Sequence, residues 1–292
     1  MASHTSGSQG SVTEEIGPGR SAGALAAFVR RYPRLFVLTG AGCSTGSGIP
    51  AYRGADGQWQ SRPPVQYAAF VASPATRRRY WSRSLAGWPR VAQASPNAAH
   101  RALGRLERLG HVALLVTQNV DGLHQRAGSR RVLDLHGRLD SVECLSCGGS
   151  YPRADIQSLL SGWNPGHGDR TAVAAPDGDA GVAEEDLEDF AVPDCPACGG
   201  VLKPAVVFFG ENVPSGRVQT AASGVAAADA VLVVGSSLMV YSGYRFCVAA
   251  AEQGKPAAAV NLGRTRADGL LSLKVAGDCG EILSALLERL EA

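Results

Sequence analysis

The chain has 292 residues, of which 45% are hydrophobic, and its formal net charge is +2. This length and apolar content suffice for one large domain, or for a large and a small one. The weak net charge excludes a general attraction to nucleic acid or to an acidic membrane surface, and no apolar run is long enough to predict a membrane span.

The first 19 residues are polar and rich in Gly and Ser, and we expect a disordered tail there. They lack a charged start followed by an apolar stretch, so they do not resemble a secretory signal. Seven cysteines, an odd number, then favour free thiols or metal ligands in a reducing compartment. We expect a cytoplasmic protein, because the N-terminus does not support mitochondrial targeting either.

Five short apolar runs predict buried parallel strands, each followed by polar or Gly-rich residues. Helical patterns lie between several of them, for example at 98–109 and 218–228. Strands that alternate with helices predict an α/β fold with a doubly wound, Rossmann-like parallel sheet. Ligands of such folds bind at the carboxyl ends of the strands. The runs are LFVLT at 35–39, ALLVT at 113–117, AVVFF at 205–209, AVLVV at 230–234 and AAAVN at 257–261.

Two segments interrupt this alternation. Residues 56–97 show no strand-like run and include a basic helical stretch at 75–85, which predicts a helical module. Residues 140–203 carry two cysteine pairs around a Gly-, Pro- and Asp-rich stretch, which predicts a small inserted module. The Rossmann-like core then comprises residues 20–55, 98–139 and 204–292.

The first strand runs into VLTGAGCSTGSGIPAYRG at 37–54. Gly40 and Gly42 match the start of the dinucleotide-binding pattern G-x-G-x-x-G, but Thr45 takes the place of the third glycine. A nicotinamide oxidoreductase would also have a strand ending in Asp or Glu about 20 residues later, and residues 56–97 predict none. The loop therefore predicts a phosphate-containing ligand but argues against hydride transfer.

The next group of polar residues follows the second strand, in TQNVDGLH at 117–124. A neutral histidine such as His136, in LDLHG, can act as a general base near pH 7. Single His, Asn and Asp residues are more often structural or turn residues, so position alone leaves both interpretations open. The same holds for the Gly235-Ser236-Ser237 and Asn261 positions after later strands.

The cysteine pairs are Cys144-Leu-Ser-Cys147 and Cys195-Pro-Ala-Cys198, each followed by Gly-Gly. Two such turns supply four thiolates for tetrahedral zinc. The 47 residues between them exceed the about 15–20 of a compact zinc ribbon, and the inserted stretch accounts for the excess. Redox motifs or a disulfide pair are the alternatives, but a redox C-x-x-C needs a helix start. We expect a structural zinc ion held by Cys144, Cys147, Cys195 and Cys198.

These motifs together resemble the sirtuins, which are NAD-dependent protein deacylases. The matching segments are GAGCSTGSGIPAYR, TQNVDGLH, LHG, the cysteine pairs, KPAVVFFGE, VVGSSL, VNLG and DCGEIL, in the family's order over about residues 28–290. Further segments, among them QRAGSRRV, APDGD and VYSGYRF, are similar to class II sirtuins, the group of the mitochondrial lipoamidase-type enzymes.

The resemblance implies that NAD is consumed as a co-substrate. The acyl-lysine oxygen attacks the ribose carbon as nicotinamide leaves, and His136 takes a proton from a ribose hydroxyl, with Asn119 as the second catalytic residue. Lysine and O-acyl-ADP-ribose are the products. The NAD-binding residues that it implies are Gly40, Ala41, Gly42 and Ser44 at a helix start, Arg53 in a mobile loop, Gln118, Asn119, Asp121, Gly235, Ser236, Ser237, Asn261, Gly263 and Cys279.

The implied partner is an acyl-lysine protein or peptide, bound as an added strand between the two domains. Val207, Phe208 and Phe209 would line an acyl tunnel, and Gly210 and Glu211 would pair with the peptide backbone. We expect a monomer with no specific nucleic-acid or membrane partner.

The acyl group itself stays open. Tyr80 and Arg83 share one helix face, and in a related sirtuin class such a pair reads acidic acyl groups. A solvated basic face around Arg77 to Arg79 is the alternative. The stretch at 163–190 is either a lid over the tunnel or a disordered loop.

Two other functions remain as alternatives. Protein mono-ADP-ribosyl transfer on the same fold uses the same residues. A non-enzymatic zinc-ribbon protein that binds nucleic acid would need a clustered basic surface with aromatic residues, which the net charge does not favour. One departure from the family concerns Ala51, where many sirtuins have Asp, and Gly54, where they have Ser or Thr. It predicts slower turnover or weaker NAD binding.

Overall fold

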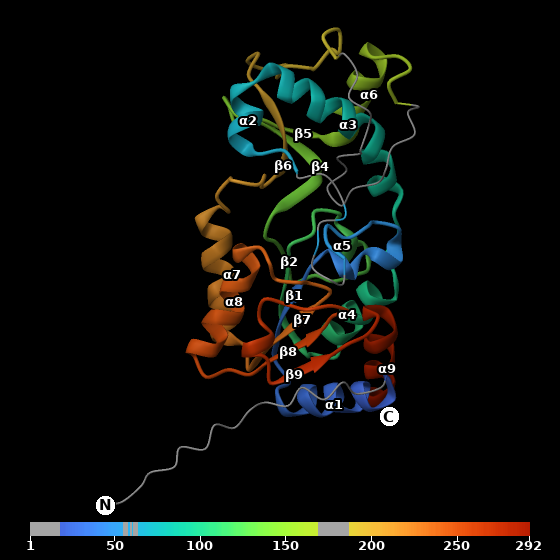
Figure 1. Ribbon diagram of the computed structural model, residues 1–292, viewed down its shortest axis with the longest axis vertical. Helices are drawn as coiled ribbons and strands as arrows, with labels where there is room; N and C mark the ends of the chain where they lie inside the picture. Colours follow the sequence, from blue (N-terminus) through green and yellow to red (C-terminus); the bar gives the residue numbers. More distant parts are fainter. Residues whose placement is uncertain (1–17, 55–57, 59, 61–63, 169–186) are drawn as a thin grey trace, which may run out of the picture.

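The computed structural model describes residues 18–54, 58, 60, 64–168 and 187–292. Within them the chain forms a large domain around a parallel sheet and a small domain at one end of it (Figure 1). Helix α1 begins at Pro18, so the predicted tail at 1–19 lies almost wholly outside the described residues. The same is true of the middle of the 163–190 stretch.

Six strands build the large sheet in the order β3-β2-β1-β7-β8-β9, and every neighbouring pair is parallel. The strand order reverses between β1 and β7. Ligands of open α/β sheets bind at such a reversal, outside the carboxyl ends of the strands. The predicted Rossmann-like fold is confirmed. The strands are β1 Leu35–Thr39, β2 Val112–Thr117, β3 Val132–Asp134, β7 Ala230–Val234, β8 Ala257–Val260 and β9 Leu273–Val275.

Helices cover both faces of this sheet (Figure 1). Side chains of β1 alternate between the faces: Leu35 and Val37 pack against one group of helices, Phe36 and Leu38 against the other. Because both faces are buried, the strand reads as an unbroken apolar run. One face carries α1 Pro18–Arg31, α4 Ala98–Arg108 and α9 Cys279–Glu291, and the other carries α7 Ser215–Ala227 and α8 Tyr241–Glu252.

The small domain has a three-stranded antiparallel sheet in the order β5-β4-β6. Its helices share one hydrophobic cluster with that sheet, in which Trp81 and Ile156 are fully buried. The segments predicted as separate helical and cysteine-bearing modules therefore pack as one unit. The elements are α2 Tyr67–Ala72, α3 Pro74–Gln93, β4 Gly137–Cys144, β5 Ser150–Pro152, α6 Arg153–Trp163 and β6 Leu202–Val206. The short helix α5 Leu123–Arg126 lies between β2 and β3 of the large sheet.

One predicted strand was wrong. The run at 205–209 was expected in the parallel sheet, but β6 ends at Val206 and pairs antiparallel with β4 in the small domain. A five-residue apolar run looks the same in either sheet. The following residues, Val207 to Phe209, leave the strand and reach the site described below.

Element ends shift by a few residues elsewhere. Helix α3 was expected at 75–85 but continues through Pro89 to Gln93, and Ser73 caps its start by accepting a hydrogen bond from the Thr76 amide at 3.2 Å. The three-residue strands β3 and β9 were not predicted, because they are too short to carry a periodic signal. None of the described helices is long and apolar enough to span a membrane.

Two lysines hold the ends of elements in the large domain. Lys255 Nζ donates to the carbonyl oxygens of Val225 and Ala228 at 2.7 Å each, where the last carbonyls of α7 lack partners within the helix. Lys274 Nζ lies 2.7 Å from Asp268 Oδ2. Both amino groups therefore have protein partners.

Candidate active site

A cavity of about 650 Å³ lies at the reversal of strand order, between the two domains. The loops after β1, β2, β7 and β8 line its polar side, and residues after β6 line the other. It contains every predicted NAD-binding, catalytic and substrate residue except Arg83. The predicted residues in its wall are Gly40, Ala41, Gly42, Ser44, Arg53, Tyr80, Gln118, Asn119, Asp121, His136, Val207, Phe208, Phe209, Gly210, Glu211, Gly235, Ser236, Ser237, Asn261, Gly263 and Cys279.

The loops after β1 and β7 touch through glycines. A Cβ atom on Gly235, whose φ is 60°, would lie 2.2 Å from the Cys43 amide nitrogen, and one on Gly40 would lie 2.7 Å from Ser236 Cβ. Only glycine permits these approaches. Leu238, in the same β7 loop, has a φ of 57°, which is a strained conformation for a residue with a side chain. The loops after β1 and β7 therefore adopt irregular backbone conformations where they line the cavity.

The β1 loop differs from its expected form. Instead of an α-helix start, two 3₁₀ turns follow, η1 Ala41–Cys43 and η2 Thr45–Ser47. Closely spaced glycines disfavour an α-helix, and Gly48 ends the second turn in a left-handed conformation. Gly42 N–H already donates to Gly235 O at 2.8 Å, so not all of the predicted backbone donors face the cavity.

Side chains from three strand ends form two sets of hydrogen bonds. Asn119 Nδ2 donates to Gly40 O at 3.0 Å and to Ser44 Oγ at 2.9 Å, and Ser44 Oγ donates to Asp121 Oδ2 at 2.7 Å. Gln118 Nε2 donates to Ser236 Oγ at 2.8 Å. These bonds fix the polar wall before a ligand arrives, which lowers the ordering cost of binding.

His136 is held by both ring nitrogens. Nδ1 lies 3.0 Å from Gln118 O, which only accepts, so Nδ1 carries the proton. Nε2 therefore accepts from Ser242 Oγ at 2.8 Å. Burial lowers the pKa of His136 to about 4, although the Gln118 carbonyl acts in the opposite direction. The ring is thus neutral at pH 7, with a basic Nε2 turned toward a hydroxyl.

Ser242 lines the cavity, but the sequence did not single it out. It lies in VYSGYRF, a segment that was used only as evidence of similarity to class II sirtuins. A hydroxyl two residues into α8 has no chemical signature of its own. Its partner came from 106 positions earlier in the chain, and only the fold brings them together.

Behind the β1 loop lie two further histidines. His124 Nε2 lies 2.9 Å from Thr39 Oγ1, and His100 Nε2 lies 3.4 Å from Ser44 Oγ. Burial lowers the pKa of His100 to about 4 and that of His124 to about 3. The sequence treated both as ordinary structural residues, and their closeness to each other, with ring centroids 4.8 Å apart, was not foreseen.

The apolar end of the cavity is aromatic. Phe208 lies edge-on to Phe70, with ring centroids 5.1 Å apart, and packs against Tyr80 at 5.2 Å. Tyr80 is 3% exposed. Arg83 is on the same helix but outside the cavity wall, so the structure does not bring the predicted Tyr80 and Arg83 pair together there.

A buried ion pair supports this aromatic wall. Lys203 is 1% exposed, and its Nζ donates to Val206 O at 2.6 Å and lies 3.3 Å from Glu211 Oε2. The same carboxylate accepts from the Phe208 amide at 2.8 Å. The Glu211 side chain therefore fixes the loop after β6, which was not part of its predicted contact with a peptide backbone.

The segment with Ala51 and Arg53 covers one side of the cavity. Tyr52 O accepts from the Gln60 amide, and Gly54 N–H donates to Gln58 O, each at 2.9 Å. Residues 55–57, 59 and 61–63 lie outside the described residues. The predicted effect of Ala51 on closure of this segment stays a prediction.

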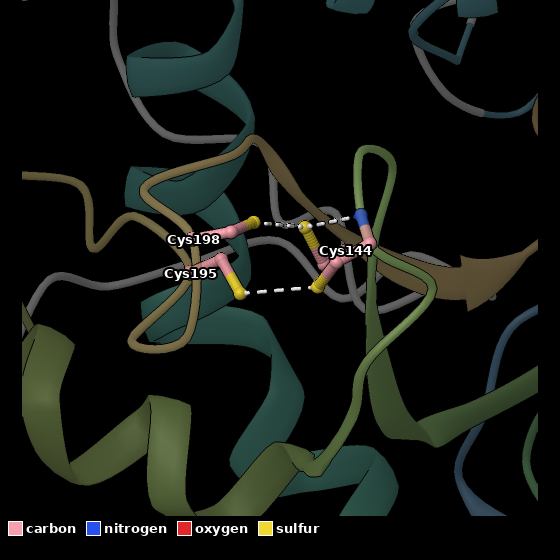
Figure 2. A group of neighbouring side chains, drawn as sticks. Cys144, Cys195 and Cys198 are labelled. Atoms are coloured by element: carbon pink, nitrogen blue, oxygen red, sulfur yellow. Dashed lines mark hydrogen bonds between the residues drawn. The ribbon is translucent and has the colours of Figure 1, made fainter.

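The four predicted zinc ligands meet in the small domain. Cys144 Sγ lies 3.6 Å from Cys198 Sγ, and Cys147 Sγ lies 3.7 Å from Cys195 Sγ. Sulfur atoms about 2.3 Å from a tetrahedral zinc ion are about 3.8 Å apart, so the spacing fits Zn²⁺ with four thiolates. Figure 2 shows sulfur atoms of the two turns facing one another. Four protein ligands leave no open position, which makes the site structural.

Known proteins share this arrangement. A model of the Sir2 family matches residues 40–242. An "NAD-dependent protein deacetylase" of Xanthomonas campestris pv. campestris (strain 8004) is 60% identical over 90% of each chain. The "NAD-dependent protein deacylase Sirt4" of Drosophila melanogaster is 45% identical over 89% of this chain and 85% of that protein.

Solved structures agree. The protein in the solved structure described as "Structural Basis for the Mechanism and Regulation of Sir2 Enzymes" is 32% identical to this chain and superposes with a TM-score of 0.73. The match covers 93% of this chain and 98% of the other. The protein in the solved structure described as "Sir2-p53 peptide-NAD+" is 29% identical to this chain, with a TM-score of 0.74. The match covers 91% of this chain and 97% of the other. The resemblance inferred from the motifs is confirmed: the chain belongs to the Sir2 family of NAD-dependent enzymes.

Proposed function

We propose that the protein removes acyl groups from lysine side chains of proteins and consumes NAD in doing so. The observation that carries this proposal is His136, a neutral histidine with a free-base Nε2, in the wall of a cavity that has a polar and an aromatic end. Relatives named as NAD-dependent deacetylases and a deacylase support it.

The polar end fits NAD. Gly40, Gly42 and Gly235 let the loops after β1 and β7 pack closely together, and all three line the cavity where a pyrophosphate would lie. Gln118, Asn119 and Asp121 present amide and carboxylate groups to a ribose and a carboxamide. The cavity volume lies within the usual range of about 300–1,000 Å³ for ligand sites. When bound, NAD supplies an electrophilic ribose carbon and nicotinamide as a leaving group.

The chain's own residues orient the reactants and move one proton. His136 Nε2 accepts the proton of a ribose hydroxyl, and Nδ1–H remains bound to Gln118 O. Asn119 and Ser44 hold the polar wall in place. The aromatic residues around Phe208 exclude water from the reacting oxygen, and positioning of a weak amide nucleophile supplies much of the rate.

For the acyl group we propose a chain with an uncharged end, larger than acetyl. Tyr80 and Phe208 give that end of the cavity an aromatic surface, and Arg83 is not part of the wall. The 45% identity to a Sirt4 deacylase favours the class II assignment. Acidic acyl groups, read by Arg83, are the second candidate, because Tyr80 does line the cavity.

The test is a panel of peptides with acetyl, lipoyl, succinyl, glutaryl and methylglutaryl lysine, incubated with NAD. We expect nicotinamide and O-acyl-ADP-ribose in equal amounts, with the highest kcat/KM for lipoyl lysine, and loss of both products in His136→Ala at unchanged zinc content. Preference for acidic groups that disappears in Arg83→Ala would overturn the acyl assignment.

Product identity separates the two reactions of this fold. If nicotinamide release is matched by ADP-ribose attached to protein rather than to the acyl group, the enzyme is a mono-ADP-ribosyltransferase. Full activity of His136→Ala on acyl peptides would contradict the role of Nε2.

A further inference from the structure

Cys43, His100 and His124 form a buried cluster behind the β1 loop, separate from the four-cysteine site. Their ligand-type atoms all lie within 4.8 Å of one another. The three residues are 1%, 0% and 1% exposed. They come from η1, α4 and α5, so the cluster joins three elements around one point.

One nitrogen of this cluster has no partner. His124 uses Nε2 for the contact with Thr39, but Nδ1 is buried without any hydrogen bond in the described structure. A buried polar atom left without a hydrogen bond is destabilising. His100 is held only loosely: its ring nitrogens lie 3.4 Å from Ser44 Oγ and 3.3 Å from the Asn97 amide. Little bonding is lost when these rings turn to another ligand.

The electrostatic surroundings favour a cation. Burial is the main cause of the raised pKa of Cys43, and the charges of Cys279, Asp121 and Asp278 raise it further. The carboxylates of Asp121 and Asp278 also attract a divalent ion. A thiolate and one carboxylate would together neutralise its two positive charges.

The cluster lies beside a second cavity. This cavity of about 480 Å³ lies against η1 and the first turns of α4 and α9, and Cys43, Asn97 and Asp278 are in its wall, whereas His100 and His124 are not. An ion that enters it meets the residue Cys43 first and needs a local movement to reach the two buried histidines.

We propose that Cys43, His100 and His124 form a second transition-metal site that takes Zn²⁺ or ions of similar ligand preference. Thiolate with two imidazoles is a donor set typical of zinc. On binding, a metal–sulfur bond forms and the thiol proton goes to solvent. The four-cysteine site offers four protein ligands, whereas this cluster offers three. The second site therefore binds its ion more weakly and exchanges it.

The ion would act against NAD. Three protein ligands leave a fourth position, and the adjacent carboxylate is that of Asp121, which hydrogen-bonds Ser44 beside His100. Drawing Asp121 toward the ion removes it from the NAD pocket. By linkage, NAD weakens the ion's affinity by the same factor. This part of the inference rests on the proposed function.

The experiment adds Co²⁺ to the full-length, zinc-loaded protein and records its absorption spectrum. We expect thiolate-to-cobalt charge transfer and the visible bands of a four-coordinate ion. Both should be absent in Cys43→Val, which keeps the side-chain volume, and in His124→Asn. Cys247→Val is the matched control, since Cys247 is a fully buried cysteine outside the cluster, and it should retain the bands.

Two outcomes would overturn the site: no charge-transfer band in the wild type, or the same band in Cys43→Val. The coupling is measured separately by NAD affinity in calorimetry. Co²⁺ should weaken NAD binding several-fold in the wild type and not in Cys43→Val. Equal affinity with and without Co²⁺ would remove the coupling, and absence of NAD binding altogether would count against the proposed function instead.

Discussion

His136 owes its protonation state to two neighbours of different kinds. The Gln118 carbonyl can only accept, which fixes the ring proton on Nδ1, and the Ser242 hydroxyl then donates to Nε2. A donor to Nε2 stabilises the neutral ring, so it acts in the same direction as burial, which lowers the pKa to about 4. A ribose hydroxyl that approaches Nε2 has to replace Ser242 as the donor.

We expect Ser242→Ala to move the acid limb of the kcat/KM profile to higher pH by roughly half to one unit. The reason is that one hydrogen bond is worth about 0.5–1.5 kcal/mol and one pKa unit is about 1.4 kcal/mol. The measurement is kcat/KM for an acyl peptide from pH 4 to 8. Ser242→Thr retains the hydroxyl and serves as control. An unchanged profile with a lowered melting temperature would mean that Ser242 is only structural.

The sequence identified site residues where a motif carries their chemistry and missed those that act through contacts. Gln118, Asn119 and His136 follow strands in recognisable order. Ser242 and the pair of His100 and His124 were missed, because the partners that bring them to the site lie 56 to 106 positions away. Arg83 was predicted as a site residue because helical spacing places it on the same face as Tyr80. It is not in the cavity wall, because spacing along a helix does not determine which residues face a cavity.

Among the elements, β6 connects the cysteine site to the cavity. Its strand begins four residues after Cys198 and ends at Val206, directly before Val207 to Phe209. Lys203 and Glu211 then fix the position of Phe208. If the cysteine turns become disordered, β6 loses its anchor and the aromatic end of the cavity, which directly follows β6, is displaced. The polar end is formed by loops of the large domain and is affected less.

We expect Cys195→Ser to lose zinc, to lower the unfolding free energy by on the order of 5 kcal/mol, and to raise KM for the acyl peptide more than KM for NAD. Zinc content, thermal unfolding and steady-state kinetics measure the three effects. The control is Ser146→Ala. Ser146 lies in the other cysteine turn but is not a zinc ligand, so this variant should retain zinc and unchanged KM values for both substrates. A metal-free, fully stable Cys195→Ser protein would refute the structural role.

At this scale the sequence predicted the parallel strands whose two buried faces produce apolar runs. It could not assign β6, because the sheet to which a short run belongs depends on its partner strand. The reversal of strand order between β1 and β7 is likewise a matter of pairing. The position of the site at that reversal therefore became visible only in the fold.

For the whole molecule, three neutral histidines, of which His100 and His124 are fully buried and His136 is half-buried, link stability to pH. His100, His124 and His136 have pKa values of about 4, 3 and 4, below the ordinary value of 6.5. Between pH 6.5 and these lower values the unfolded chain binds more protons than the folded chain. The stabilisation from the neutral histidines is therefore fully present above pH 6.5 and is lost as the pH falls toward about 3 to 4.

We expect a loss on the order of several kcal/mol between pH 7 and pH 4.5. Urea unfolding of the protein at both pH values, with the four-cysteine site loaded and no free zinc in the buffer, measures it. Because His100→Gln removes one of the three groups, its stability should depend less steeply on pH. A free energy of unfolding that stays constant over this range would contradict the argument.

The burial of Lys203 has a consequence for the whole surface. The chain has only three lysines, Lys203, Lys255 and Lys274, and each amino group is already bonded: within the small domain, at the end of α7, and to Asp268. Arginine supplies the remaining basic charge, and its guanidinium does not form the acyl amides that lysine does. The chain thus offers an acyl donor almost no free lysine amine, so few acyl-lysine groups can form on the protein itself.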